Sequence, residues 1–234
     1  MSGLQLPPLF EPMATAGEDP FAVACKAAQD GCDAGLVAYD LRPDVLRAAI
    51  VFAPEVPLQK ATIMLPICGV GFQNALGALA PPEVGVHLQW DGTIRVNGGV
   101  CGTLKMAASP RVVDQEPDWL VVGLTLDLWP ADEDTGLTPD VTALFNEGCA
   151  DVEAPLLLEA WVRHTLVWIN TWLDDGARPV HMEWKGITHG LSEPAQHGTL
   201  NGAFTGVDED FGMILQHDSG TTIIPLTEIL TEAP

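Results

Sequence analysis

Basic residues are scarce in this sequence. Its 234 residues include 10 lysines and arginines against 32 aspartates and glutamates, which gives a formal net charge of −22 at pH 7. Residues 1–117 hold 7 of the 10 basic residues but only 12 of the 32 acidic ones, so the second half carries most of the negative charge. Nucleic-acid phosphates and anionic membrane surfaces are bound through clustered lysine and arginine. The composition therefore predicts no nucleic-acid partner and no membrane partner.

Long apolar runs and paired cysteines are also lacking. The most apolar run, residues 63–72, is broken by Pro66 and two glycines, and it is shorter than the roughly 18 residues of a membrane-spanning helix. The five cysteines are scattered and form no C-x-x-C pair, a pattern typical of reduced, mostly buried thiols. Residues 1–17 contain no lysine or arginine, so no secretory signal is expected. These absences predict a soluble cytoplasmic protein.

Signatures of common enzyme classes are missing as well. The sequence has no P-loop, no G-x-S-x-G elbow, no H-E-x-x-H helix and no G-x-G-x-x-G following a strand. The histidines at 181, 189 and 197 recur every eight residues, which is no known ligand spacing. The acidic triplets at 132–134 and 208–210 lack a calcium-loop pattern and are interpreted as solvated turns. No metal site is predicted.

The sequence does contain enough apolar residues, 47%, for a substantial core. Asp19 and Pro20 predict the start of a helix that continues to Asp30. A long apolar helix over residues 58–79 is expected to bend or break at Pro66, and its Gly69-Val70-Gly71 segment is interpreted as close packing or a kink. Further helices are expected after Thr138-Pro139 and over 153–174, and strands over 35–39, 47–52, 86–90, 94–96, 100–106, 119–128, 200–206, 213–217 and 221–225.

The most informative segments are W-D-G-T-I-R-V-N-G-G-V-C-G-T-L (residues 90–104) and W-L-V-V-G-L-T-L-D-L (residues 119–128). Asp91-Gly92 and Asn97-Gly98 are hairpin signals that predict an antiparallel meander. The two segments resemble the biotin-protein ligase and lipoate ligase family, whose members carry W-P-N-D, a short strand, N-G, then K-x-x-G-I-L and a later G-I-G-I-N strand. The helix over residues 156–173 and the strands over 202–230 are similar to the family's closing helix and C-terminal β-barrel.

The resemblance implies an α+β fold. Residues 1–185 are expected to form a class II synthetase-like biotin/lipoate ligase catalytic domain, with a mixed or antiparallel sheet flanked by helices. Residues 186–234 are expected to form the small β-barrel module. The resemblance also implies an enzyme that uses ATP to form an acyl-adenylate and transfers a biotin- or lipoate-like acid to a protein lysine.

Several family positions are altered in this sequence. The segment that corresponds to the family's Gly-Arg-rich loop, residues 39–47, has no glycine and offers only Arg42 and Arg47. The family's pocket lysine corresponds to Gly99, and the asparagine associated with metal and nucleotide corresponds to Asp127. Lys105 has the same strand parity as Gly99, but six residues place it about 20 Å away. It is therefore interpreted as an exposed strand-end lysine. The catalytic residues remain open, with Arg42, Lys105 and Asp127 as candidates.

The rest of a substrate pocket is retained in this interpretation. Glycines would allow a ligand to approach the backbone closely, and a tryptophan would give it an apolar floor. An equally weighted alternative is that the glycines only serve the tight hairpin. The substrate-binding candidates are Trp90, Gly92, Thr93, Gly99, Gly102 and Thr103.

Three functions are compatible with these features. The favoured one is a ligase-like protein that keeps a binding pocket for a small carboxylic acid or a carrier domain but has impaired adenylation. The first alternative is an active ATP-dependent ligase, and the second is an interaction module without enzymatic activity. No cofactor is expected unless ligase activity is retained, in which case ATP and magnesium are required.

Overall fold

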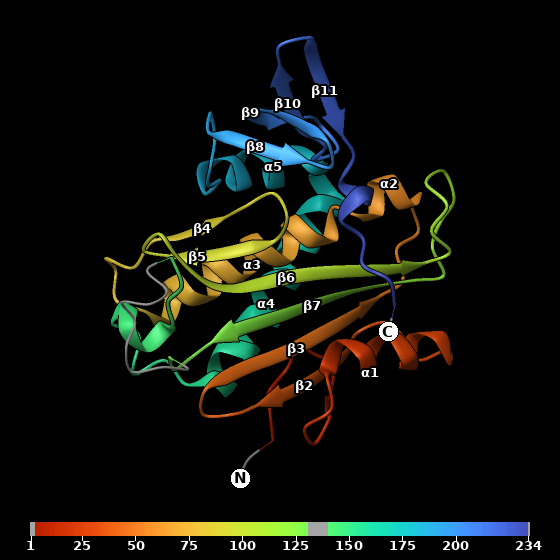
Figure 1. Ribbon diagram of the computed structural model, residues 1–234. Coiled ribbons are helices and arrows are strands. Elements are labelled where there is room, and N and C mark those ends of the chain that lie inside the picture. Colours follow the sequence, from red (N-terminus) through yellow and green to blue (C-terminus); the bar gives the residue numbers. More distant parts are fainter. Residues whose placement is uncertain (1–2, 131–139, 234) are drawn as a thin grey trace.

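The computed structural model describes residues 3–130 and 140–233, and a seven-stranded mixed sheet forms its centre. The strand order is β1-β2-β3-β7-β6-β5-β4, and every neighbouring pair is antiparallel except β1 and β2. Helices flank the sheet on both sides (Figure 1), which confirms the predicted α+β architecture. The strands are β1 (Glu11–Ala14), β2 (Leu36–Leu41), β3 (Val45–Phe52), β4 (Val86–Leu88), β5 (Thr93–Val96), β6 (Gly99–Ser109) and β7 (Trp119–Asp127).

One face of the sheet is partly covered by α1 (Pro20–Gln29). The Asp19 side chain accepts a hydrogen bond from the backbone N–H of Phe21 at 3.2 Å, and Pro20 is the first helical residue, as the sequence predicts. The buried side of α1 packs on a small apolar cluster in the sheet, which leaves the rest of this face uncovered by α1. The cluster consists of Phe21, Ala24, Cys25, Ala28, Ala38, Ala49, Val51, Ala107, Trp119 and Val121.

The opposite face is covered by α3 (Met64–Leu79) and α4 (Ala154–Asp175), while α2 (Leu58–Ala61) precedes α3 and α5 (Ala177–Gly186) lies beside the C-terminal strands. The prediction of a bend at Pro66 was wrong, because the apolar segment breaks at Thr62 and Ile63 instead. Pro66 lies in the first turn of α3, where backbone N–H groups have no partner within the helix, so the proline is tolerated. Residues 58–79 are long and apolar enough to cross a membrane, but 72% of that window is buried inside the fold, as in a core helix.

Gly71 brings α3 and α4 into close contact. A Cβ at this position would lie 2.9 Å from the backbone nitrogen of Thr165 on α4. The sequence interpretation of Gly69-Val70-Gly71 as close packing therefore applies, and α3 continues through it without a break.

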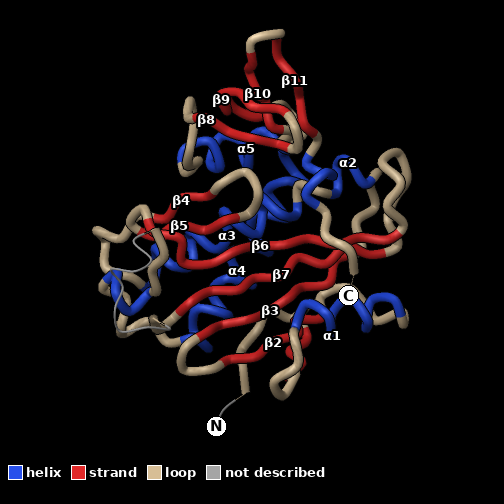
Figure 2. The backbone as a smooth tube through the Cα atoms, in the orientation of Figure 1, coloured by secondary structure: helices blue, strands red, loops and turns tan. Residues whose placement is uncertain are grey.

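The C-terminal part forms a second sheet of four antiparallel strands in the order β11-β10-β9-β8 (Figure 2). These are β8 (Pro194–His197), β9 (Leu200–Val207), β10 (Met213–His217) and β11 (Gly220–Ile224). The sequence predicts β9, β10 and β11 but not β8. Short 3-10 helices occur at η2 (Leu144–Glu147) and η3 (Leu226–Ile229). The expected helix cap at Thr138-Pro139 and the acidic triplet at 132–134 lie outside the described residues.

The small sheet is joined to the main one at its entry and at its exit. Leu88 on β4 forms a parallel bridge with Thr188, just before the small sheet begins. At the far end of the chain, the Thr231 N–H donates to the Met106 carbonyl on β6 at 2.8 Å. The Trp90 indole also donates to the Phe211 carbonyl at 2.7 Å. The small sheet is thus fixed to the main domain.

The cysteines behave as isolated thiols. Four of the five are buried, and none forms a disulfide. Burial is the largest effect on Cys25 and raises the pKa of its thiol to about 11. A protonated thiol is a poor nucleophile, so Cys25 does not fit a catalytic role.

Candidate functional site

A row of polar side chains crosses the part of the sheet that α1 leaves uncovered. Asp40 on β2 pairs with Arg47 on β3, and Arg47 pairs with Thr125 on β7. Thr125 pairs with Thr103 on β6, which pairs with Thr93 on β5. Directly paired residues project from the same face of a sheet, so these five side chains lie side by side on the face turned toward the viewer in Figure 1. We call this row the polar ladder.

Lys105 lies between the polar ladder and α1. It pairs with Gly123 across the strands, its Nζ is 3.5 Å from the Asp19 carboxylate, and it lies 4.2 Å above the Phe21 ring. A Cβ on Gly123 would come within 2.6 Å of the Phe21 ring, so Phe21 fills the space above this glycine. The interpretation of Lys105 as an exposed strand-end residue was therefore wrong. It lies in the middle of β6, and its side chain is only 35% exposed.

Asp127 and Arg42 lie at the other side of the polar ladder. Asp127 is the last residue of β7 and pairs with Val45, the first residue of β3. Burial and, to a smaller extent, the charge of Asp44 raise the pKa of Asp127 above its ordinary value. Arg42, in the turn between β2 and β3, donates from Nε to Asp40 at 2.8 Å. These two catalytic candidates therefore border the polar ladder.

Asp40 holds both arginines of this face. Arg42 and Arg47 each form an ion pair with the same oxygen of Asp40. The hydrogen bond from Arg47 is the main reason why the pKa of Asp40 is below its ordinary value, and the charge of Arg42 adds to it. The Nε of Arg47 is buried and has no hydrogen-bond partner within the described residues. That N–H is out of reach of a ligand, but the Arg47 side chain is 25% exposed, so the exposed part of its guanidinium can still contact an oxyanion.

A shift in strand register separates the predicted glycines from Lys105. The pairing of β5 with β6 changes between Ile94 and Arg95, and Cys101 is left without a partner on β5. Such an extra residue reverses the side-chain alternation beyond it. Gly99 consequently pairs with Val96, which belongs to the core on the helix side of the sheet. The prediction that Gly99 and Lys105 share a face was wrong.

The other predicted pocket residues either lie away from the polar ladder or allow close packing of the backbone. Trp90 is buried, donates to Phe211 and has its ring edge to face with His197, so it contacts the small sheet rather than the polar ladder. A Cβ on Gly92 would lie 2.3 Å from the Leu104 carbonyl, and one on Gly102 would lie 2.3 Å from the Thr125 carbonyl. Both glycines are thus required by close backbone packing. Of the six pocket candidates, Thr93 and Thr103 belong to the polar ladder.

Sequence reasoning missed Asp40, Thr125 and Phe21. The alternation within each strand indicates which residues share a face, but only the pairing between strands brings Asp40 and Thr125 into one row. For Phe21, the sequence indicated only that it is an early residue of the predicted helix. Within residues 3–130 and 140–233, no group of three or more His, Cys, Asp or Glu side chains is arranged to hold a metal ion.

The comparisons with known proteins agree on one family. The model of the Biotin/lipoate A/B protein ligase family matches residues 6–186, and that of a domain family of unknown function matches residues 191–232. A biotin--[acetyl-CoA-carboxylase] ligase of Paracoccus denitrificans is 25% identical over 191 residues, 77% of each chain. Among solved structures, a biotin protein ligase-like protein of unknown function from Silicibacter sp. TM1040 is 57% identical, with 98% and 100% of the two chains covered and a TM-score of 0.93. A biotin protein ligase from Aquifex aeolicus is 13% identical, with 92% and 94% covered and a TM-score of 0.73.

Proposed function

Because the chain belongs to the Biotin/lipoate A/B protein ligase family, we propose that it binds a small carboxylic acid, or a carrier domain bearing one, at the polar ladder and that its adenylation is impaired. The observation that supports this most directly is the state of the two arginines. Asp40 neutralises much of their charge, yet the Arg42 and Arg47 side chains remain 47% and 25% exposed. This arrangement suits one carboxylate better than a chain of phosphates.

The partly exposed arginines and their neighbours can hold a carboxylate. A carboxylate oxygen accepts charge-assisted hydrogen bonds from guanidinium groups. The half-buried Thr125, opposite Arg47, carries a hydroxyl that can donate to the same group, whereas the hydroxyl of the exposed Thr103 beside it donates to the Leu104 carbonyl. The body of the acid would then lie toward Phe21, which already occupies the space above Gly123. Phe21 therefore limits the size of the acid at this side.

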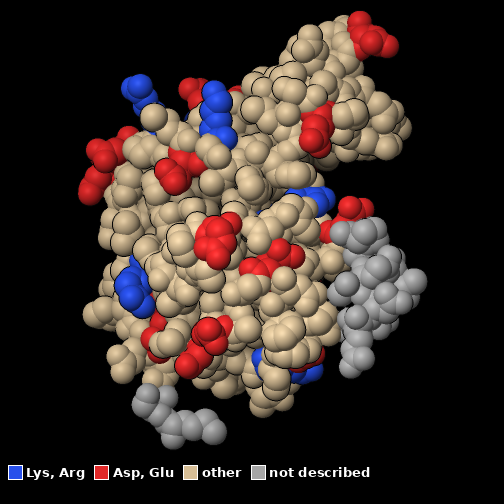
Figure 3. Space-filling model, turned by 90° about the vertical axis from the view of Figure 1, so that its left-hand side faces the viewer, with Lys and Arg blue, Asp and Glu red and all other residues tan. Residues whose placement is uncertain are grey.

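Adenylation needs more positive charge than this face offers. A nucleoside triphosphate brings several negative charges that have to be matched by cations. Asp127 projects from this face two residues beyond Thr125, Asp44 is close enough to raise its pKa, and the family's lysine position is Gly99. On the adjoining side of the molecule, which Figure 3 shows, basic side chains are also separated by acidic and uncharged residues. The few cations around the polar ladder suit a magnesium–nucleotide complex poorly, which supports the proposal of impaired adenylation.

The active ligase is the second candidate. The relative from Paracoccus denitrificans is named as a biotin ligase, and a solved structure of the Aquifex aeolicus enzyme is a complex with biotin and ATP. Under this alternative the chain would bind ATP and magnesium and modify a lysine of a carrier protein.

An interaction module without a ligand is the third candidate. We also place a domain boundary between residues 185 and 186 and the protein in the cytoplasm.

Ligand binding and pyrophosphate exchange separate the three candidates. The purified protein is tested for thermal shifts with biotin, lipoate, octanoate and ATP–magnesium, singly and in pairs. An acid at about 100 times its Kd adds roughly 2.7 kcal/mol of stability, which raises Tm by roughly 5–10 °C at this chain length. The proposal expects a shift with an acid alone and no acid-dependent ATP–pyrophosphate exchange. Exchange would establish the ligase, and no shift with any compound would support the interaction module.

A matched pair of variants tests the location. Thr125→Val removes the ladder hydroxyl at nearly constant volume, and Thr221→Val makes the same change at an exposed position of β11. A lost hydrogen bond to a charged group weakens binding by about 1.5–3 kcal/mol, or about tenfold or more in Kd. The acid should bind Thr125→Val that much more weakly and Thr221→Val as it binds the parent protein. Equal Kd values for the two variants would place the acid elsewhere.

A further inference from the structure

A cavity of about 770 Å³ lies on the helix side of the main sheet, away from the polar ladder. It opens where α2, the end of α4 and the start of α5 meet the turn between β9 and β10. Cavities of about 300–1,000 Å³ are the usual size for small-molecule sites and often occur where domains meet. No part of the polar ladder contributes to its wall, so it is a separate site.

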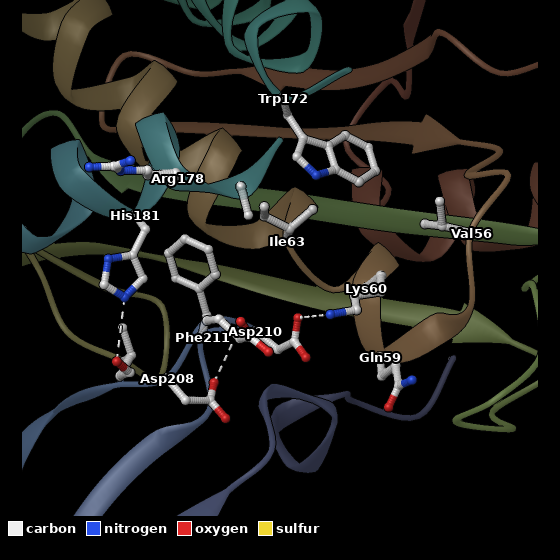
Figure 4. Close-up of a pocket in the computed structure, with 13 residues that line it drawn as sticks. Val56, Gln59, Lys60, Ile63, Trp172, Arg178, His181, Asp208, Asp210 and Phe211 are labelled. Atoms are coloured by element: carbon white, nitrogen blue, oxygen red, sulfur yellow. Dashed lines mark hydrogen bonds and ion pairs between the residues drawn. The ribbon is translucent and has the colours of Figure 1, made fainter. Parts of the chain in front are cut away.

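The inner part of this cavity is apolar. Val56 and Ile63, which lie before and after α2, form one side, and Trp172 near the end of α4 forms another. In Figure 4 the Trp172 indole stands across the cavity from the Phe211 ring. Phe211 is itself almost fully buried, whereas Trp172 is half-buried and therefore has ring surface left to cover. These walls fit a ligand with an aromatic or aliphatic body.

The charged groups lie mainly on one wall. Asp208, Glu209 and Asp210 form the turn between β9 and β10, so the interpretation of this triplet as a plain solvated turn was incomplete. Asp208 accepts hydrogen bonds from the N–H groups of Asp210 and Gly212, which orient its carboxylate. Asp210 pairs with Lys60 of α2 at 2.5 Å, and this hydrogen bond raises the pKa of Lys60 and keeps it charged. The turn therefore has two carboxylates that no lysine neutralises.

Among the described residues that line the cavity, the remaining cation is Arg178 at the start of α5, which Figure 4 shows away from the acidic turn. Three carboxylates thus face two cations, and one of these cations is already paired. An anionic ligand would meet Asp208 and Glu209 with only Arg178 to attract it. A positively charged ligand is favoured by the turn and also by the net charge of −22.

We propose that this cavity is a second binding site, which takes an organic ammonium ion with an aromatic or aliphatic body. The ammonium group lies at the turn formed by Asp208 and Glu209, and the body lies between Trp172 and Ile63. This inference is independent of the acid site and of the proposed function.

The test uses two indole compounds that differ in charge. Tryptamine carries an ammonium group and indole-3-acetate a carboxylate on nearly the same body, and both are titrated into the full-length protein by calorimetry. We expect saturable tryptamine binding and at least about tenfold weaker binding of indole-3-acetate, a difference of 1.4 kcal/mol. Absence of saturable tryptamine binding, or equal affinities for the two compounds, would overturn the proposal.

Charge-removing variants place the ligand in the cavity. Glu209→Gln should weaken tryptamine binding about two- to fivefold, the usual worth of an exposed charge pair, and Arg178→Gln should strengthen it. Glu83→Gln and Arg163→Gln remove the same charges at exposed positions that do not line the cavity. Both controls should bind tryptamine as the parent protein does. If each control matches its cavity variant, tryptamine responds only to net charge and the proposal fails.

Discussion

Replacing Gly71 with alanine should destabilise the protein, although alanine is the better helix former. The new Cβ would lie 2.9 Å from the nitrogen and 3.1 Å from the Cα of Thr165, both backbone atoms of α4. Carbon atoms in favourable contact are about 3.5–4.0 Å apart, so α3 and α4 would have to separate by about 0.5–1 Å. Such overpacking costs about 1–3 kcal/mol, which outweighs the gain of up to about 1 kcal/mol from the higher helix propensity of alanine.

Gly77 provides the matched control in the same helix. Nothing lies within 4 Å of a Cβ built at this position, and the residue is exposed. Gly77→Ala should therefore stabilise the protein by up to about 1 kcal/mol. Because 1 kcal/mol corresponds to about 2–4 °C at this chain length, thermal unfolding should show Tm values that move in opposite directions. A rise in Tm for Gly71→Ala similar to that of Gly77→Ala would refute the close contact of the two helices.

Three further outcomes are expected. Trp90→Phe keeps most of the ring but leaves the buried Phe211 carbonyl without its donor, which should cost about 1–3 kcal/mol in denaturant unfolding; an unchanged midpoint would contradict the hydrogen bond. Asp127→Asn should be more stable than the parent protein at pH 7. Folding raises the pKa of Asp127 above its unfolded value of about 3.9. The folded protein therefore loses stability as the pH rises from about 3.9 to the pKa of Asp127 in the folded state. The advantage of the variant should disappear below about pH 3.9 in equilibrium unfolding, and an advantage that persists there would have another origin. Asp40→Asn should release both arginines from their ion pairs and increase the affinity for pyrophosphate in calorimetric titration, with no increase expected if the arginines are not limited by Asp40.

The sequence predicts most elements of the main domain because their signals are local. Asp19 and Pro20 mark the start of α1 by capping chemistry, and the Asp-Gly and Asn-Gly turns mark the meander. The break was predicted at Pro66 and occurs before it, because a proline is disfavoured inside a helix but not in its first turn. The strands β1 and β8 and the helix α5 were missed. β1 gains order only from its parallel pairing with β2, and β8 only from its pairing with β9, and neither partner is visible in the local sequence.

The candidate site depended on information that one strand does not contain. Lys105 and Gly99 are six residues apart, which predicts a common face in a regular strand. The unpaired Cys101 adds one residue to β6 and places Gly99 on the other side. In the same way, the shared use of Asp40 by Arg42 and Arg47 follows from a turn geometry that composition does not reveal. Charge counting correctly indicated that cations are few, but not which carboxylate holds them.

The attachment of the small sheet at both ends has a consequence for its removal. The half of β6 that extends past β5 has its free edge next to the C-terminal tail, where Leu230 bridges to Met106 and the Thr231 N–H binds the same residue. A fragment that ends at residue 185 would lose this tail together with the bridge from Thr188 to β4. Two lengths of strand would then expose unpaired backbone groups, and exposed strand edges pair readily with other chains. Excision of the C-terminal module would therefore favour self-association of the remaining domain rather than leave it as an intact monomer.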